Sequence, residues 1–286
     1  MKQMMKYIIL FSIIVSSLFF NKQLVAQNYQ ETLNFALNQY DQKNYSVALK
    51  SFKRLIYFNT DGNLFPLYTA VAEIAFLQHD FETSQYNYGL AYNVAKSDSL
   101  KNEMLFGKAY SQILNKNYHY AIIDLLAVKE LDKNTKQKLN FYLGTCYFGL
   151  EQFDRSKKYF KLCLDTTEIK QLDLLFSKHN LLTPSPRKAR ILSMLMPGLG
   201  QFYVGKYRNG LNSFLLSVGL VAIGIRTAVN IDPLYALISV APWFQRYYTG
   251  GYTNAEKIAI VKRQNKRSTL YNSVIDLIVK GNNKLN

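Results

Sequence analysis

Hydrophobic and polar positions along the middle of the chain follow a helical period that recurs. An aromatic residue is followed three positions later by a small residue, and four positions after that by a large one. This spacing places all three on one face of an α-helix. The pattern occurs four times, at intervals of 36, 37 and 35 residues: Tyr45-Ala48-Phe52, Phe81-Ser84-Tyr88, Tyr118-Ala121-Leu125 and Phe153-Ser156-Phe160.

A second small residue stands twelve positions before each of those small residues. These earlier positions are Ala36, Ala72, Ala109 and Gly144. Small side chains let two helices approach closely, so each patterned helix is predicted to pair with an antiparallel helix that precedes it.

These helix pairs resemble the tetratricopeptide repeat, a helix–turn–helix unit of about 34 residues. The last unit matches best, with Leu143, Gly144, Tyr147, Phe153, Ser156 and Phe160 on the family's pattern. Where the family has a turn glycine, this chain has Lys43, His79, Lys116 and Glu151. The resemblance implies a helical solenoid over residues 28–182, closed by a capping helix within Glu168–Lys178, because a single repeat cannot bury its own apolar face. Helical pairs without a true repeat are the alternative.

In this repeat family, the first helix of each unit lines a concave groove. Carried over by position, the groove residues are Leu33, Leu37, Tyr40, Phe76, Phe106, Tyr110, Phe141 and Phe148. An apolar, aromatic groove suits an extended or helical peptide of a partner protein. The alternative occupant is the chain's own C-terminal helices.

The last third of the chain contains long apolar runs. Thr183-Pro184-Ser185-Pro186 interrupts the helical pattern and predicts a domain boundary. Beyond it, Leu211–Val229 is long enough to cross about 30 Å of hydrocarbon, whereas Leu234–Phe244, which contains Pro242, is marginal as a span. A third crossing by Ile191–Val204 is an open alternative, so the sequence leaves the topology unresolved.

Glycine and proline are unusually dense just before the longest apolar run. A soluble helix loses about 1 kcal/mol for each Gly and about 3 kcal/mol for Pro, whereas membrane helices carry more of both. The segment Pro197-Gly198-Leu199-Gly200-Gln201-Phe202-Tyr203-Val204-Gly205, followed by Gly210, resembles the family of small two-transmembrane-helix domains and related envelope proteins of bacteria. The resemblance implies a membrane module over residues 187–250. We interpret the motif residues as structural, packing two helices together: Pro197, Gly198, Gly200, Gln201, Tyr203, Gly205 and Gly210.

Positive charge is concentrated around these apolar segments. The chain has a net charge of +16, and from Pro186 onward 14 lysines and arginines face three acidic residues. Because the basic residues flank apolar runs without a nucleic-acid motif, the pattern favours an anionic membrane surface over nucleic acid. Residues 251–286 are predicted to form a separate basic helix that begins at a capping box, Thr253 to Glu256, and stops at Gly281. Its basic residues face lipid headgroups or solvent.

The N-terminus has the pattern of an export signal. Lys2 and Lys6 precede the apolar stretch Tyr7–Phe20, which predicts a secretory signal peptide over residues 1–26, cleaved after Ala26, or else an uncleaved anchor. Export would place the repeats outside the cytoplasm, in the periplasm. For the two cysteines, Cys146 and Cys163, two buried thiols are favoured over a disulfide.

Residues that carry catalysis do not cluster in the sequence. His79, His119 and His179 are isolated, and no metal, cofactor or nucleophile motif accompanies them. We therefore expect an all-α, non-enzymatic scaffold without a cofactor, tethered to the membrane of a bacterial cell envelope. Its repeats would bind a protein or peptide partner, and its membrane helices offer a route to a homo-oligomer. The alternative is a component of a membrane transport or channel assembly.

Overall fold

The computed structural model describes residues 29–58, 62–129 and 132–283, so the predicted signal peptide lies outside the described residues. The regular elements of this described part are all helices, which confirms the all-α class. The chain divides into two compact units, residues 1–156 and 157–286, and this division precedes the predicted break at Thr183–Pro186.

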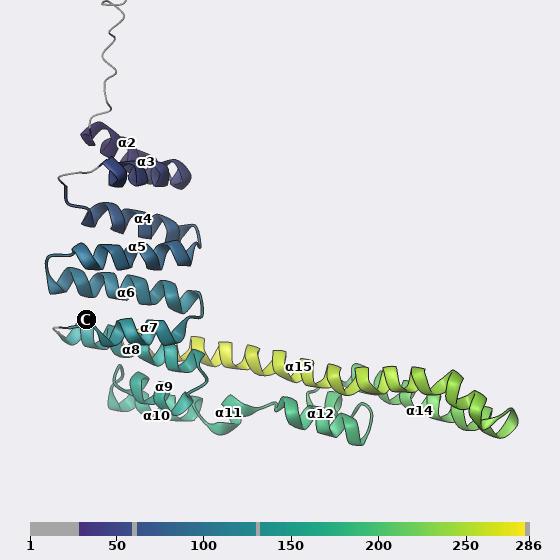
Figure 1. Ribbon diagram of the computed structural model, residues 1–286. Coiled ribbons are helices and arrows are strands. Elements are labelled where there is room, and N and C mark those ends of the chain that lie inside the picture. The colour runs from purple at the N-terminus through teal and green to yellow at the C-terminus, as the bar shows by residue number, and fades with distance from the viewer. Residues whose placement is uncertain (1–28, 59–61, 130–131, 284–286) are drawn as a thin grey trace, which may run out of the picture. The chain divides into compact units, whose positions relative to one another are not determined.

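The first unit is a succession of helices in which each packs against the next, as Figure 1 shows for α4, α5 and α6. Its described helices are α2 (Tyr29–Asp41), α3 (Tyr45–Phe58), α4 (Phe65–Leu77), α5 (Phe81–Val94), α6 (Asp98–Leu114), α7 (Tyr118–Leu126) and α8 (Lys133–Gly149). The helix α9 (Phe153–Lys161) spans the division between the units.

Small residues at the predicted positions form the contacts between these helices. All eight are buried: Ala36, Ala48, Ala72, Ser84, Ala109, Ala121, Gly144 and Ser156. Two of the serines satisfy their hydroxyl groups inside the core. The hydroxyl of Ser84 lies 2.9 Å from that of Ser111, and Ser156 donates to the backbone carbonyl of Gly144 at 2.8 Å. A larger side chain would separate the paired helices.

The four helix pairs turn with the same backbone geometry. Lys43, His79, Lys116 and Glu151 all adopt the left-handed conformation, with φ between 59° and 61°. In the first turn, the N–H of Lys43 donates to the carbonyl of Tyr40 and the N–H of Asn44 to the carbonyl of Gln39. This is a Schellman motif, which satisfies the last carbonyls of a helix and usually places glycine at the left-handed position. The other three turns repeat its hydrogen bonds.

The second unit is built on one long helix, α15 (Pro233–Asn283), which contacts every helix from α10 to α14. Those helices are α10 (Thr166–Leu175), α11 (Lys178–Leu182), α12 (Pro186–Leu195), α13 (Leu199–Tyr203) and α14 (Tyr207–Asn230). Figure 1 shows α14 and α15 as an antiparallel hairpin. At its tip the carboxylate of Asp232 accepts the N–H groups of Leu234 and Tyr235, at 2.8 and 2.9 Å, and so caps α15.

One sequence prediction about this unit is wrong. The basic tail is not a separate helix, because α15 runs without a break through Thr253 and Glu256 and past Gly281. Packing along its length against α10–α14 outweighs the local capping signals. The segment Ile191–Val204, the alternative third crossing, is not a continuous helix, since α12 ends at Leu195 and α13 begins only at Leu199.

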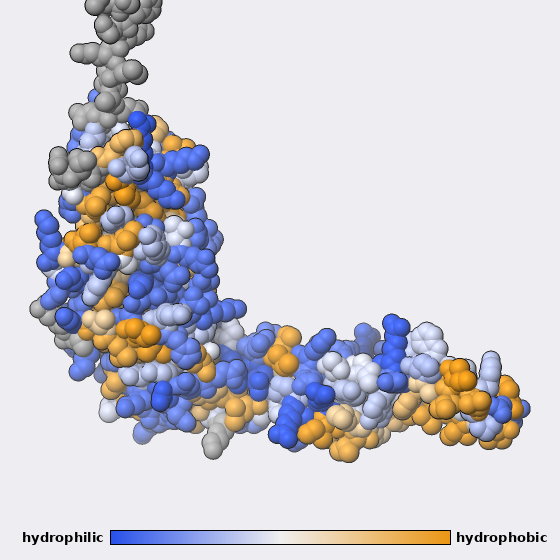
Figure 2. All heavy atoms as spheres, in the orientation of Figure 1, coloured by the Kyte–Doolittle hydropathy of each residue, from blue (hydrophilic) through white to orange (hydrophobic). Residues whose placement is uncertain are grey.

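Among the described residues, α14 is the one helix that is long and apolar enough to cross a membrane. It has 24 residues, and 6 % of its most apolar window is buried, so its apolar side chains face outward. The predicted span Leu211–Val229 lies within it. Figure 2 shows hydrophobic side chains gathered at the far end of the α14–α15 hairpin.

Candidate functional site

Aromatic rings from three helices of the first unit form a continuous row. The ring of Phe76 on α4 lies 5.2 Å from that of Tyr110 on α6, and Tyr110 stacks at 5.9 Å on Tyr142 of α8. Phe106 and Phe141 contact Tyr142 at 5.6 and 5.9 Å. The structure thus brings four of the predicted groove residues together through Tyr142, which the sequence analysis did not select.

The other four predicted groove residues do not join this row of rings. Leu33 and Tyr40 are partly buried against the core of α2–α4, and Leu37 is exposed on α2. Phe148 pairs with Phe153 at 5.4 Å. Phe106 is buried, with 4 % of its surface exposed, yet it lines a cavity of about 480 Å³ together with Glu103 and Lys138.

One carboxylate, that of Glu103, lines the cavity beside Phe106, and its charge acts on Glu73 and Tyr88. Burial, and secondarily the charge of Glu103, raises the pKa of Glu73. Burial and the charges of Glu73 and Glu103 raise the pKa of Tyr88 to about 12. Negative charge is therefore disfavoured at Glu73 and at Tyr88.

The glycine-rich motif of the second unit is a close-packed junction. A Cβ atom on Gly200 would collide with the backbone oxygen of Ala189, and one on Gly198 with that of Gly210. Gly198 and Gly205 have φ values of 92° and 76°, which side chains rarely tolerate. Gly210 faces the ring of Phe202.

Gln201 ties three segments together at the centre of this junction. Its side chain is fully buried, accepts the hydroxyl of Ser193 on α12 at 2.8 Å and donates to the carbonyl of Gly251 on α15 at 2.8 Å. The hydroxyl of Tyr203 accepts the N–H of Ser185 at 3.1 Å. Pro197 stands between α12 and α13, where it prevents their fusion into one helix.

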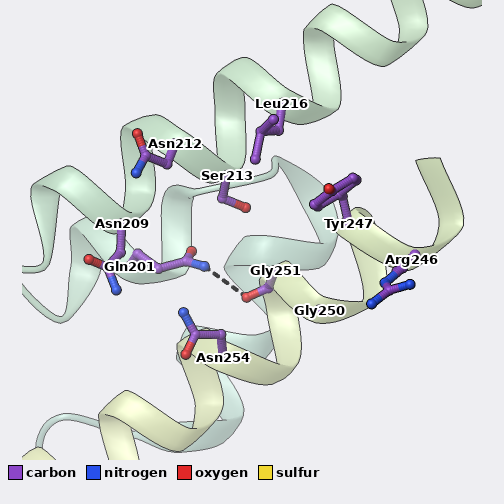
Figure 3. Close-up of a pocket in the computed structure, with 10 residues that line it drawn as sticks. All are labelled: Gln201, Asn209, Asn212, Ser213, Leu216, Arg246, Tyr247, Gly250, Gly251 and Asn254. Carbon is purple, nitrogen blue, oxygen red and sulfur yellow. Dashed lines mark hydrogen bonds between the residues drawn. The ribbon is translucent and has the colours of Figure 1, made fainter. Parts of the chain in front are cut away.

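A cavity of about 400 Å³ opens next to Gln201. It is lined by Gln201, Asn209, Asn212, Ser213, Leu216, Arg246, Tyr247, Gly250, Gly251 and Asn254. Figure 3 shows α14 on one side of it and α15 on the other, with the Gln201 amide between them. Apart from Gln201, the sequence analysis missed these residues, although asparagines at the start of an apolar run were a visible signal.

Basic residues on α15 bind carbonyl groups at helix ends. Lys262 donates to the carbonyl of Val204 at 2.9 Å, Lys266 to that of His179 at 3.3 Å and Arg267 to that of Leu181 at 2.9 Å. Val204 follows α13, while His179 and Leu181 belong to α11. The buried Arg267 therefore faces neither headgroups nor solvent, because a cation at a helix C-terminus satisfies the free carbonyls there.

The other candidate groups among the described residues are the two cysteines and the side chains that could bind a metal ion. Cys146 and Cys163 are buried thiols, and burial raises the pKa of each to about 12. Within the described ranges, no three His, Cys, Asp or Glu residues are grouped closely enough to hold a metal ion. Comparison with known protein families, characterised proteins and solved structures finds no match to this chain.

Proposed function

We propose that this chain is a non-enzymatic, membrane-tethered adapter of a bacterial cell envelope. In this proposal, a tetratricopeptide-like solenoid binds a segment of a partner protein, and the C-terminal module holds the chain in the bilayer. The observation that carries the proposal is the aromatic row of Phe76, Tyr110 and Tyr142, which crosses three successive first helices of the repeats. Tyr110 remains 41 % exposed and is available to a ligand.

The charge of Glu103 beside Phe106 favours a basic partner segment. A lysine or arginine placed there would approach the faces of the aromatic rings and the carboxylate of Glu103 together. Such a cation would also relieve the repulsion that raises the pKa of Glu73. We therefore propose an extended segment that combines basic and apolar side chains.

The tether is proposed from α14. A 24-residue apolar helix with its side chains turned outward would expose a large apolar surface to water in a soluble protein. A bilayer removes that surface from water, and the 24 residues extend about 36 Å along the helix axis, enough to cross the hydrocarbon.

The partner-binding proposal is tested by site-specific photo-crosslinking with the full chain in its native envelope. A photoreactive residue at Tyr110 is expected to crosslink to a defined partner through a basic segment identified by mass spectrometry. The matched control is Tyr86 on α5, which is 67 % exposed and outside the row. Identical products from both positions would contradict the proposal. Solute flux through liposomes that carry the whole chain would instead favour the transport alternative.

A further inference from the structure

We propose that the cavity between α14 and α15 binds the phosphate group of an anionic phospholipid. This inference rests on the proposed membrane tether and concerns a different part of the chain from the partner-binding row. It assigns a ligand class to a cavity that the adapter function leaves unused.

The cavity is lined mainly by uncharged polar side chains together with Arg246, and by no carboxylate. The side-chain amides of Asn209, Asn212 and Asn254 make no hydrogen bond to another described residue, and the buried hydroxyl of Ser213 has no partner. Arg246 adds a permanent positive charge. A phosphate group has several acceptor oxygens and a negative charge, so it matches these donors and the guanidinium together.

The glycines of α15 make room for such a group. Gly250 and Gly251 line the cavity, and a Cβ atom on Gly250 would meet no other atom. Gly251 lies directly against the hydroxyl of Ser213. The volume of about 400 Å³ falls within the range of small-molecule sites, about 300–1,000 Å³, and is large enough for a phosphate with its glycerol.

The position along α14 favours a lipid as the source of the phosphate. Asn209, Asn212 and Ser213 lie in the first two turns of α14, and exposed apolar residues such as Leu215, Val218 and Val221 follow them. If that apolar part crosses the hydrocarbon, the first turns lie at the level of the headgroups. On α15, Trp243 and Tyr247 stack at 6.5 Å and supply the aromatic side chains that are enriched at this interface.

The test is native mass spectrometry of the full chain, purified in detergent and titrated with phosphatidylglycerol or phosphatidylcholine of identical acyl chains. Both lipids carry the phosphate, but the trimethylammonium group of phosphatidylcholine cancels the net charge that attracts Arg246, so we expect the protein to retain phosphatidylglycerol about tenfold better. Arg246→Gln and Asn212→Leu should each reduce this retention to the level of phosphatidylcholine. Arg208→Gln, which removes a neighbouring exposed charge outside the cavity, should leave it unchanged.

Equal retention of the two lipids by the unaltered chain would overturn the proposal, as would equal losses in Arg246→Gln and Arg208→Gln. Competition by millimolar glycerol phosphate, with the same sensitivity to Arg246→Gln, would assign the site to a soluble phosphate ester and overturn the lipid assignment. Circular dichroism of each variant checks that it folds. Carbonate extraction of membranes tests the tether separately, so its failure is distinguishable from failure of the cavity.

Discussion

The side-chain amide of Gln201 donates a hydrogen bond of 2.8 Å to the backbone carbonyl of Gly251, although the two residues are 50 positions apart. The same side chain accepts the hydroxyl of Ser193, so a single buried glutamine connects α12, α13 and α15. A buried amide with both ends satisfied fixes one arrangement of helices, because any other would leave it unpaired at a cost of about 1–3 kcal/mol. The motif thus acts as a junction between helices.

The first prediction concerns the glycines of this junction. Gly200→Ala should lower the thermal stability of the detergent-purified chain and its accumulation in membranes, because the new Cβ atom would collide with the backbone oxygen of Ala189. The matched control is Gly219→Ala on α14, where no atom lies within 4 Å of an added Cβ, and stability should be maintained. Normal accumulation of Gly200→Ala combined with loss of a cellular function would show that the motif is a functional site.

The second prediction concerns the left-handed turns within the helix pairs. Lys43→Gly should raise the free energy of unfolding by about 1 kcal/mol, because the left-handed conformation costs a side chain roughly 1–2 kcal/mol and glycine adopts it freely. Lys50→Gly, in the exposed middle of α3, should lower it by about 1 kcal/mol. Urea unfolding followed by circular dichroism measures both. A loss of stability in Lys43→Gly would rule out the proposed strain.

The third prediction is a pH dependence at Glu73. Its folded-state pKa is raised above 4.5, so the folded chain holds this proton more tightly than the unfolded chain does. The side chain therefore lowers stability as the pH rises from about 4.5 through the folded-state pKa. Glu73→Gln should stabilise the protein at about pH 7 and have little effect at about pH 4. Equal gains in urea unfolding at both pH values would contradict this assignment.

Glu103→Gln serves as the companion variant for that measurement. The charge of Glu103 is the second cause of the raised pKa of Glu73, after burial. Removing that charge should lower the pKa of Glu73 and recover part of the stability gain near pH 7. A basic peptide bound beside Glu103 should act in the same direction.

The fourth prediction concerns the two cysteines. Burial raises the pKa of both thiols to about 12, so at pH 8 the reactive thiolate is scarce and shielded from reagents. Iodoacetamide should modify neither Cys146 nor Cys163 in the folded chain, and both after unfolding without a reductant, as measured by mass spectrometry. A requirement for reductant after unfolding would reveal a disulfide and contradict the structure.

Local pattern determined much of the first unit. The four aromatic–small–large triplets predicted helices whose small residues are buried, and Ala48, Ser84, Ala121 and Ser156 are fully so. The turn positions were also visible, since the residues that replace glycine are the ones with positive φ. These features are encoded within a few neighbouring residues, because a helix face repeats every three to four positions and a turn is set by a few backbone angles.

The second unit shows what the sequence could not determine. The capping box at Thr253 and Glu256 is a sound local signal, yet α15 continues through it because α10–α14 pack along its length. The basic residues of α15 suggested lipid or solvent, whereas Lys266 and Arg267 bind carbonyls of a helix more than 80 positions earlier. In the same way, residues of α13, α14 and α15 line the cavity together, and Gln201 of α13 is held there by its hydrogen bond to Gly251.

By itself, then, the sequence determined the helical class, the buried small residues, the turns and the apolar run of α14. The tertiary structure alone decided which predicted helices join into one, which basic side chains bind the carbonyl groups at helix ends, and which polar residues line a cavity. The physical reason is the separation, along the chain, of the residues that interact. Helix periodicity and turn geometry depend on neighbours a few residues away, whereas a hydrogen bond such as that from Gln201 to Gly251 depends on how distant segments pack.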